Sequence, residues 1–127
     1  MGYLIVFLGA GLGGALRHGV NLASARLFGL EFPYGTLIVN ILGSLAMGLL
    51  AGYFAFRLGI PQHMRLFLTT GILGGFTTFS AFSLDAALLM ERHAYWSAAT
   101  YVAGSVVLSL LALFVGLSLF RTGAPLP

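Results

Sequence analysis

The chain has 127 residues, of which 59% are hydrophobic and only 7% are charged, whereas about 25% of the residues in a soluble domain are charged. Six arginines and three acidic residues cannot cover a compact globule of this size with polar surface, so a water-soluble domain is excluded and an integral membrane protein is indicated. The chain has no cysteine, which excludes disulfides, thiolate metal sites and thiol nucleophiles.

Four apolar runs predict four membrane-spanning helices, because a span needs about 20 apolar residues. The expected helices cover approximately residues 2–26, 36–56, 66–90 and 94–120. To reach spanning length, the first must continue past Arg17, and we expect the third to continue past Asp85, so each carries one charge within it. The short loops leave no room for a soluble domain. The expected fold is an all-α, multi-pass transmembrane domain over residues 1–127.

The distribution of arginines bears on orientation, because the side with more Lys and Arg stays in the cytoplasm. With four spans, the N-terminus, the second loop and the C-terminus share one side, which carries Arg57, Arg65 and Arg121. The other side carries Arg26 and Arg92, and a third arginine if the one in the first helix is counted. This balance predicts insertion in both orientations, which makes an antiparallel two-fold homodimer available. Insertion in one orientation is the alternative.

Residues 9–14 match the pattern G-x-G-x-x-G of dinucleotide-binding loops. That pattern binds a dinucleotide only between a strand and a helix, with an acidic residue about 20 positions later, and this context is missing. Like residues 44–52, which read S-x-x-x-G-x-x-x-G, these glycines have the spacing that lets membrane helices approach closely. We interpret both segments as packing surfaces and not as cofactor sites.

Residues 71–83 form an unusual stretch for a membrane helix. The adjacent glycines Gly74 and Gly75 precede several hydroxyl residues, a combination that disfavours a continuous helix. A helix can break within the membrane where its freed backbone groups are buried or line a cavity, and such breaks commonly bind ions. The sequence predicts a broken third helix, and a kinked helix with back-bonded hydroxyls is the alternative.

Polar and aromatic residues on the other helices could line an ion path. Asn40 lies within the second run, where its amide either joins two helices or faces a pore. Phe79 and Phe82 are three positions apart and share a helix face. A hydroxyl stripe on the fourth helix comprises Tyr101, Ser105 and Ser109. Core packing is the simpler interpretation of both stripes, but phenylalanine edges are electropositive and hydroxyls can replace water around an anion.

The ionisable residues suggest ion binding and not catalysis. Arg17 is the basic residue well inside a span, which makes it a candidate functional residue. Asp85 could pair with it, carry a proton or lie at the interface. The three histidines lack metal-ligand spacing. Because the sequence offers no set of nucleophile, base and orienting group and no pair of carboxylates, we do not expect an enzyme.

Three segments resemble the Fluc (CrcB) family of fluoride ion channels: Gly13-Gly14-Ala15-Leu16-Arg17, Gly35-Thr36-Leu37-Ile38-Val39-Asn40, and residues 70–83 with their Gly-Gly-x-Thr-Thr-Phe-Ser-x-Phe string. The resemblance covers the first three helices, and the hydroxyl stripe extends it into the fourth. It implies a dual-topology homodimer with two antiparallel pores, which exports fluoride passively across the inner membrane of a bacterium and lowers fluoride toxicity. The implied partners are fluoride, the lipid bilayer and a second copy of the chain; the scattered arginines do not suggest nucleic acid.

The same resemblance implies roles for individual residues. The fluoride pore would be lined by Asn40, Phe79, Phe82, Ser80, Ser83, Tyr101, Ser105 and Ser109. Arg17 would lie at a vestibule and favour the entry of anions. The backbone carbonyls of Gly74 and Thr77, two from each subunit, would bind a structural sodium ion at the dimer centre. Oxygen ligands suit such a hard cation.

Two positions depart from the family's pattern. Ala81 stands where Thr is frequent, so one vestibule hydroxyl is missing, and His18 follows Arg17 where an aromatic residue is usual. The alternative function is a small dual-topology, proton-coupled exporter of cations or drugs. Such an exporter needs an acidic residue in its binding chamber, and Asp85, near the end of a helix, is the candidate.

Overall fold

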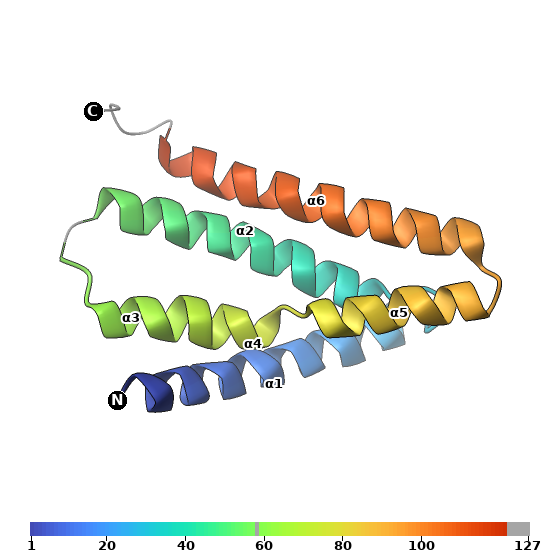
Figure 1. The fold of residues 1–127 in the computed structure, drawn as a ribbon, viewed down its shortest axis with the longest axis horizontal. Coiled ribbons are helices and arrows are strands. Elements are labelled where there is room, and N and C mark those ends of the chain that lie inside the picture. Colours follow the sequence, from blue (N-terminus) through green and yellow to red (C-terminus); the bar gives the residue numbers. More distant parts are fainter. Residues whose placement is uncertain (58, 122–127) are drawn as a thin grey trace.

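The computed structural model describes residues 1–57 and 59–121, and this part of the chain is a bundle of four helical spans without strands. Figure 1 shows α1 (Gly2–Phe28), α2 (Tyr34–Phe56), a segmented third span and α6 (Tyr95–Arg121). The third span consists of α3 (Gln62–Leu66), the π-helical η1 (Phe67–Leu73), α4 (Gly74–Phe76) and α5 (Phe79–Glu91). All four spans are long and apolar enough to cross a membrane, which confirms the expected all-helical, multi-pass fold.

The helix ends lie close to the predicted ones and are set by proline and glycine. Pro33 and Pro61 precede α2 and α3. The N–H groups at the start of a helix have no partner within the helix, so a proline at this position loses no hydrogen bond. Both helices therefore begin slightly earlier than predicted. The first helix ends slightly later, at Phe28, and Gly29 follows with a φ of 83° and donates its N–H to the carbonyl of Ala25 at 3.0 Å. A positive φ favours glycine because it has no Cβ.

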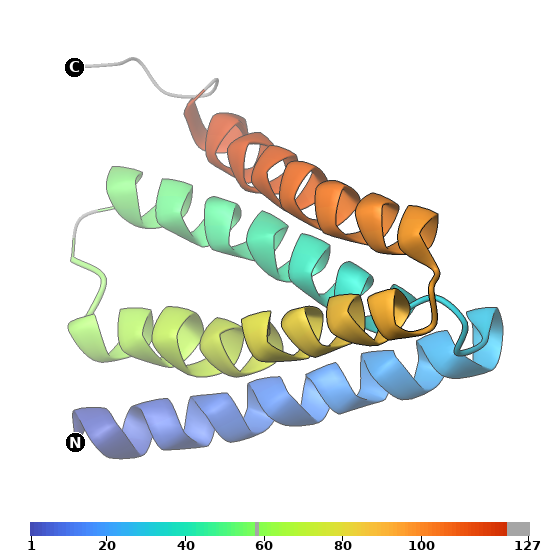
Figure 2. The same ribbon diagram turned by 45° about the vertical axis from the view of Figure 1, so that its right-hand side comes forward.

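The spans lie side by side in the order α1, third span, α2, α6 (Figures 1 and 2), and in addition α1 contacts α2 and α5 contacts α6. At the first contact, a Cβ on Gly9 would lie 2.8 Å from Gly71 Cα, and one on Gly13 would overlap the carbonyl of Ile72. The prediction of close packing is confirmed for Gly9, whereas Gly11 and Gly14 face open space because they point away from the third span.

The contact between α2 and α6 also depends on small residues. A Cβ on Gly48 would overlap the carbonyl of Leu113, and one on Gly116 would lie 2.6 Å from the carbonyl of Leu45. A Cβ on Gly52 would lie 3.1 Å from the side chain of Phe120. The packing role predicted for residues 44–52 is confirmed, because these glycines let the two helices approach closely.

Exposed aromatic side chains mark both ends of the bundle. Tyr3 is 96% exposed near the N-terminal end of α1, and Trp96 is 88% exposed at the opposite end, next to Tyr95. Tyrosine and tryptophan are enriched where a membrane protein meets the headgroup region. Between the two ends the surface carries many exposed leucine, valine and phenylalanine side chains. This distribution is typical of a protein whose spans face lipid.

Candidate functional site

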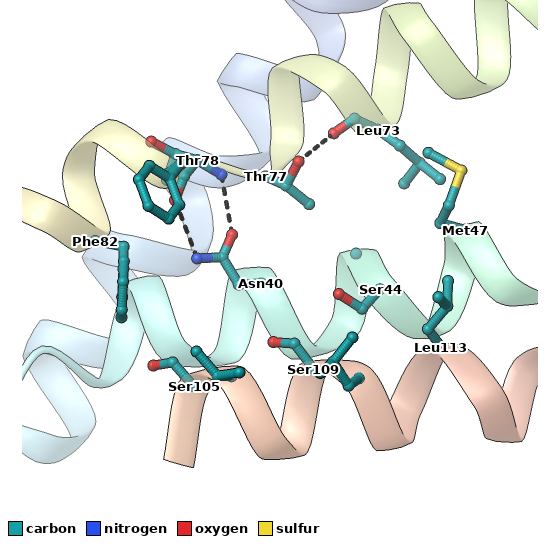
Figure 3. Close-up of a pocket in the computed structure, with 14 residues that line it drawn as sticks. Asn40, Ser44, Met47, Leu73, Thr77, Thr78, Phe82, Ser105, Ser109 and Leu113 are labelled. Atoms are coloured by element: carbon teal, nitrogen blue, oxygen red, sulfur yellow. Dashed lines mark hydrogen bonds between the residues drawn. The ribbon is translucent and has the colours of Figure 1, made fainter. Parts of the chain in front are cut away.

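A cleft of about 450 Å³ lies between α2, the third span and α6. Figure 3 shows the side chains that line it, and they come from all three of these elements. The polar residues among them are Asn40, Ser44, Thr77, Thr78, Ser105 and Ser109, and the aromatic ones are Phe79 and Phe82. A membrane-spanning chain exposes such polar groups within its spans only at a cost, so their convergence marks this cleft as the candidate site.

The helical backbone of the third span is interrupted beside this cleft. Thr77 and Thr78 are extended, with φ and ψ of −84° and 157° for the first and −153° and 122° for the second. The Thr77 N–H and hydroxyl both donate to the carbonyl of Leu73, at 3.0 and 2.9 Å. The hydroxyl of Thr78 accepts from the N–H of Ala81 at 3.1 Å and so caps α5. The interruption is therefore held by side-chain hydrogen bonds on both sides.

Asn40 joins α2 to this interruption through two hydrogen bonds with one residue. Its Nδ2 donates to the carbonyl of Thr78 at 3.0 Å, and its Oδ1 accepts from the N–H of Thr78 at 2.9 Å. The side chain thus gives the Thr78 N–H a partner in place of its lost helical one, and it adds a second donor to the Thr78 carbonyl, which as the N-cap of α5 keeps its helical bond. Of the two interpretations of this amide, the contact between helices is the one these bonds describe, while one Nδ2 hydrogen stays available on the cleft.

Two backbone carbonyls at the interruption lack their usual helical donors. In a continuous helix the N–H of Thr78 would bond to Gly74 and that of Ala81 to Thr77. Instead, the N–H of Thr78 donates to Oδ1 of Asn40, and the N–H of Ala81 donates to the hydroxyl of Thr78. Carbonyl oxygens with free lone pairs fit a hard cation such as sodium. Among the described residues no group of three His, Asp or Glu side chains could bind a metal.

The two predicted phenylalanines both line the cleft and contact each other. Their ring centroids lie 5.6 Å apart with planes tilted by 46°. The ring of Phe82 also contacts that of Tyr101, with the two centroids 5.2 Å apart, whereas the side chain of Phe79 is 78% exposed. A pair of tilted rings presents ring edges to its surroundings, and these edges carry partial positive charge.

The hydroxyl stripe on α6 divides between the cleft and the core. Ser105 and Ser109 line the cleft, and the buried Ser105 Oγ has no hydrogen-bond partner in the described part of the chain. Tyr101 is fully buried and does not line it. Its hydroxyl donates to Oδ2 of Asp85 at 3.1 Å.

Two predicted pore serines and the vestibule arginine lie outside the cleft. Ser80 and Ser83 are exposed, and the hydroxyl of Ser83 donates back to the carbonyl of Phe79 at 3.0 Å. Arg17 is half-buried and lines neither the cleft nor the second pocket described below, and His18 is exposed. Arg17 lies one helical turn beyond Gly13, which faces the N–H of Phe76. This position brings the arginine level with the interruption.

Sequence reasoning assigned no pore role to Ser44 and Thr78, which both line the cleft. Ser44 lies one turn after Asn40 on α2, so the i, i+4 spacing was a signal that could have found it. Thr78 bonds to Asn40 through its backbone groups, and no pattern of side chains in the sequence predicts such a bond.

Comparison with known proteins decides the family. Residues 4–117 match the family described as CrcB-like protein, Camphor Resistance (CrcB). The chain belongs to the CrcB-like family. A relative from Rhodopseudomonas palustris (strain BisB5), named fluoride-specific ion channel FluC, is 63% identical over 95% of this chain and 98% of its own length. One of the same name from Methylobacterium nodulans is 67% identical over 93% of this chain and 94% of its own length.

This CrcB-like chain also has a second pocket of about 450 Å³, at the end of the bundle that carries the α1–α2 and α5–α6 connections. Glu31, Asp85, Glu91 and Arg92 line it. Arg92 donates to the carbonyl of Glu31 and so ties the two connections together. Asp85 reaches this pocket and not the cleft, because it lies one turn beyond Phe82 towards the end of α5.

Proposed function

We propose that this protein is a fluoride-selective ion channel, which lets fluoride leave the cell passively across the inner membrane and so lowers fluoride toxicity. The observation that carries the proposal is the cleft, where hydroxyls, an amide and two phenylalanines converge between membrane spans. The names of the relatives, at 63% and 67% identity over nearly the whole chain, support fluoride as the ion. The protein is a channel and not an enzyme.

The composition of the cleft suits a small, strongly hydrated anion. Such an ion loses its water in an apolar medium at a high cost unless fixed donors replace that water. Ser105 and Ser109 supply hydroxyls, and Asn40 supplies its remaining Nδ2 hydrogen. The ring edges of Phe79 and Phe82 add partial positive charge without a full charge that would hold the ion too tightly. Tyr101 would contribute by supporting the ring of Phe82.

The working unit, in this proposal, is an antiparallel homodimer of dual topology with two pores. Phe79 lines the cleft yet is 78% exposed, so the cleft of one chain is open on that side. A second copy in the opposite orientation would close it and would bring the exposed Ser80 and Ser83 to the path. The balanced arginine count supports insertion both ways. The interruption at Thr77 and Thr78 is then the break in the third membrane helix beside which the ion passes.

A structural sodium ion at the dimer centre forms part of the same proposal. Its ligands would be the carbonyls of Gly74 and Thr77 from each subunit, which have lost their helical donors. A bound cation would supply positive charge that offsets the free-energy cost of moving an anion into low-dielectric surroundings. Arg17, level with the interruption, would add positive charge at a vestibule and favour anion entry.

Anion efflux from proteoliposomes tests the channel. Vesicles loaded with potassium fluoride or potassium chloride and treated with valinomycin should release fluoride rapidly and retain chloride. A fluoride electrode and a chloride electrode give the two readouts. Dimeric protein that releases no fluoride would contradict the channel proposal. Release only when a proton gradient is imposed would instead favour the proton-coupled exporter.

Replacement of sodium by N-methylglucamine tests the cation separately. The fraction of dimer in detergent, measured by size-exclusion chromatography with light scattering, should fall in sodium-free buffer and recover when sodium is restored. Potassium at the same concentration is the control for ionic strength. An unchanged dimer fraction and unchanged fluoride efflux would contradict a structural sodium ion.

A further inference from the structure

Two arginines at one end of the bundle lie on an aromatic pair. The guanidinium carbon of Arg57 lies 5.4 Å from the ring centroid of Tyr53, and that of Arg65 lies 5.3 Å from the ring centroid of Phe54. The two rings are themselves in contact, with centroids 6.0 Å apart. The end of α2 and the start of the third span thus hold both guanidinium groups on one continuous aromatic platform.

The contact of the Arg65 guanidinium within the described residues is with an aromatic ring and not with a carboxylate. Its Nε is buried and has no hydrogen-bond partner there. The three acidic residues of the chain are Glu31, Asp85 and Glu91, and all of them line the pocket at the opposite end. A buried donor of a charged group costs free energy unless it meets an acceptor. The described part of the chain therefore offers neither guanidinium an acidic partner, and an anion from outside can approach only their terminal nitrogens.

The position of the platform indicates the chemistry of an anion that could bind there. It lies where α2 ends and the third span begins, next to the partly exposed Tyr53, at the level where membrane proteins meet lipid headgroups. A guanidinium is a planar fork that matches the oxygens of a phosphate group, and it stacks on aromatic rings at the same time. Phe120, whose ring lies 5.9 Å from that of Tyr53, brings the end of α6 to the same platform.

We propose that Arg57 and Arg65, held on Tyr53 and Phe54, form a binding site for the phosphate of an anionic lipid. The headgroup phosphate would accept from the terminal nitrogens of Arg65 and of the exposed Arg57. The site is separate from the cleft, and the inference holds whether or not the cleft conducts fluoride. In an antiparallel dimer it would place one such site at each membrane face.

Lipid selectivity of the reconstituted full-length protein tests this site. In phosphatidylcholine vesicles, the immobilised fraction of spin-labelled phosphatidylglycerol is compared with that of spin-labelled phosphatidylcholine. The wild-type protein should prefer phosphatidylglycerol, and the preference should fall about fivefold or more in the double variant R57Q/R65Q. Should that variant fail to fold, R57Q alone should lower the preference by a smaller factor.

Charge-preserving variants separate a built site from general attraction. R65K keeps the charge but loses the planar fork, so it should lower the preference for phosphatidylglycerol. R26K, at an exposed arginine in the last turn of α1 at the other end, is the matched control and should leave the preference unchanged. A preference equal to wild type in R65K, or an equal fall in R26K, would overturn the proposal.

Inorganic phosphate separates a lipid from a soluble ion. Millimolar phosphate should not abolish the preference for phosphatidylglycerol beyond the effect of sodium chloride at the same ionic strength. If it does abolish the preference specifically, the site takes free phosphate, and the assignment to lipid is overturned.

Discussion

Asn40 and Thr78, which lie 38 positions apart in the sequence, exchange two hydrogen bonds of 2.9 and 3.0 Å. The amide of Asn40 therefore holds both backbone groups of Thr78 where the helix of the third span is interrupted. The same exchange keeps the Thr78 N–H away from the carbonyl of Gly74. One side chain on α2 thus stabilises the extended backbone and exposes a carbonyl on the third span.

Replacement of Asn40 by Asp tests this relationship. An ionised Asp accepts but cannot donate, so it loses the bond to the Thr78 carbonyl and places two oxygens against each other. We expect a loss of stability of about 1–3 kcal/mol and a large fall in fluoride efflux. Thermal unfolding in detergent and proteoliposome efflux provide the measurements. Ser44→Ala, one turn away on the same cleft, should change stability by about 0.5 kcal/mol or less.

Phe82→Ile should abolish fluoride efflux while the protein still folds. Isoleucine fills much of the volume but has no ring edge, and it loses the contact with Tyr101, which costs about 0.5–1.5 kcal/mol. Efflux from proteoliposomes and size-exclusion chromatography are measured together. Phe7→Ile on α1, at a phenylalanine that is 74% exposed, is the matched control and should behave like wild type. Normal efflux from Phe82→Ile would remove this ring from the pore.

Asp85→Asn should leave passive fluoride efflux largely intact. An asparagine Oδ1 can still accept from the Tyr101 hydroxyl, so the ring of Tyr101 keeps its place beside Phe82. A passive channel needs no carboxylate that cycles protons. The measurement is the initial rate of fluoride efflux at equal protein density. Complete loss of efflux from a normally assembled protein would revive the proton-coupled exporter.

The neighbours Gly13 and Gly14 should respond in opposite ways to alanine. At Gly13 the new methyl would meet the Ile72 carbonyl and the Phe76 N–H, and overpacking of this kind costs about 1–3 kcal/mol. At Gly14 nothing lies within 4 Å, and alanine in a helix is favoured over glycine by about 1 kcal/mol. Thermal unfolding of Gly13→Ala and Gly14→Ala should therefore shift in opposite directions. Equal shifts would contradict the close approach of α1 to the third span.

A reporter at the N-terminus should be found on both sides of the membrane. The balanced arginine count predicts that the chain inserts in both orientations. A cysteine placed ahead of Met1 can be labelled in intact cells by an impermeant maleimide, and after lysis the remaining population reacts. Addition of two arginines to the second loop should shift the population to one orientation. If the N-terminal cysteine is labelled from one side alone in the protein without added arginines, dual topology is excluded.

The sequence by itself determined the solvent of this protein and the number of its spans. Four long apolar runs can satisfy their backbone groups in lipid only as helices, so composition alone dictated the architecture. The helix ends differ from the predicted ones by only a few residues. Pro33, Pro61 and Gly29 set these ends by local backbone effects, which the sequence already contains. The family also followed from a local signal, the Gly-Gly-x-Thr-Thr-Phe-Ser-x-Phe string in the third span.

Tertiary structure decided which of these residues act together. Spacing placed Tyr101 with Ser105 and Ser109, yet Tyr101 is buried against Asp85 while the two serines line the cleft. Spacing grouped Gly9 with Gly11 and Gly14, yet of these three only Gly9 contacts the third span. Helical periodicity fixes which residues share a face, but the partner of that face depends on the neighbouring helix, and the bond between Asn40 and Thr78 exists only once two distant segments have packed.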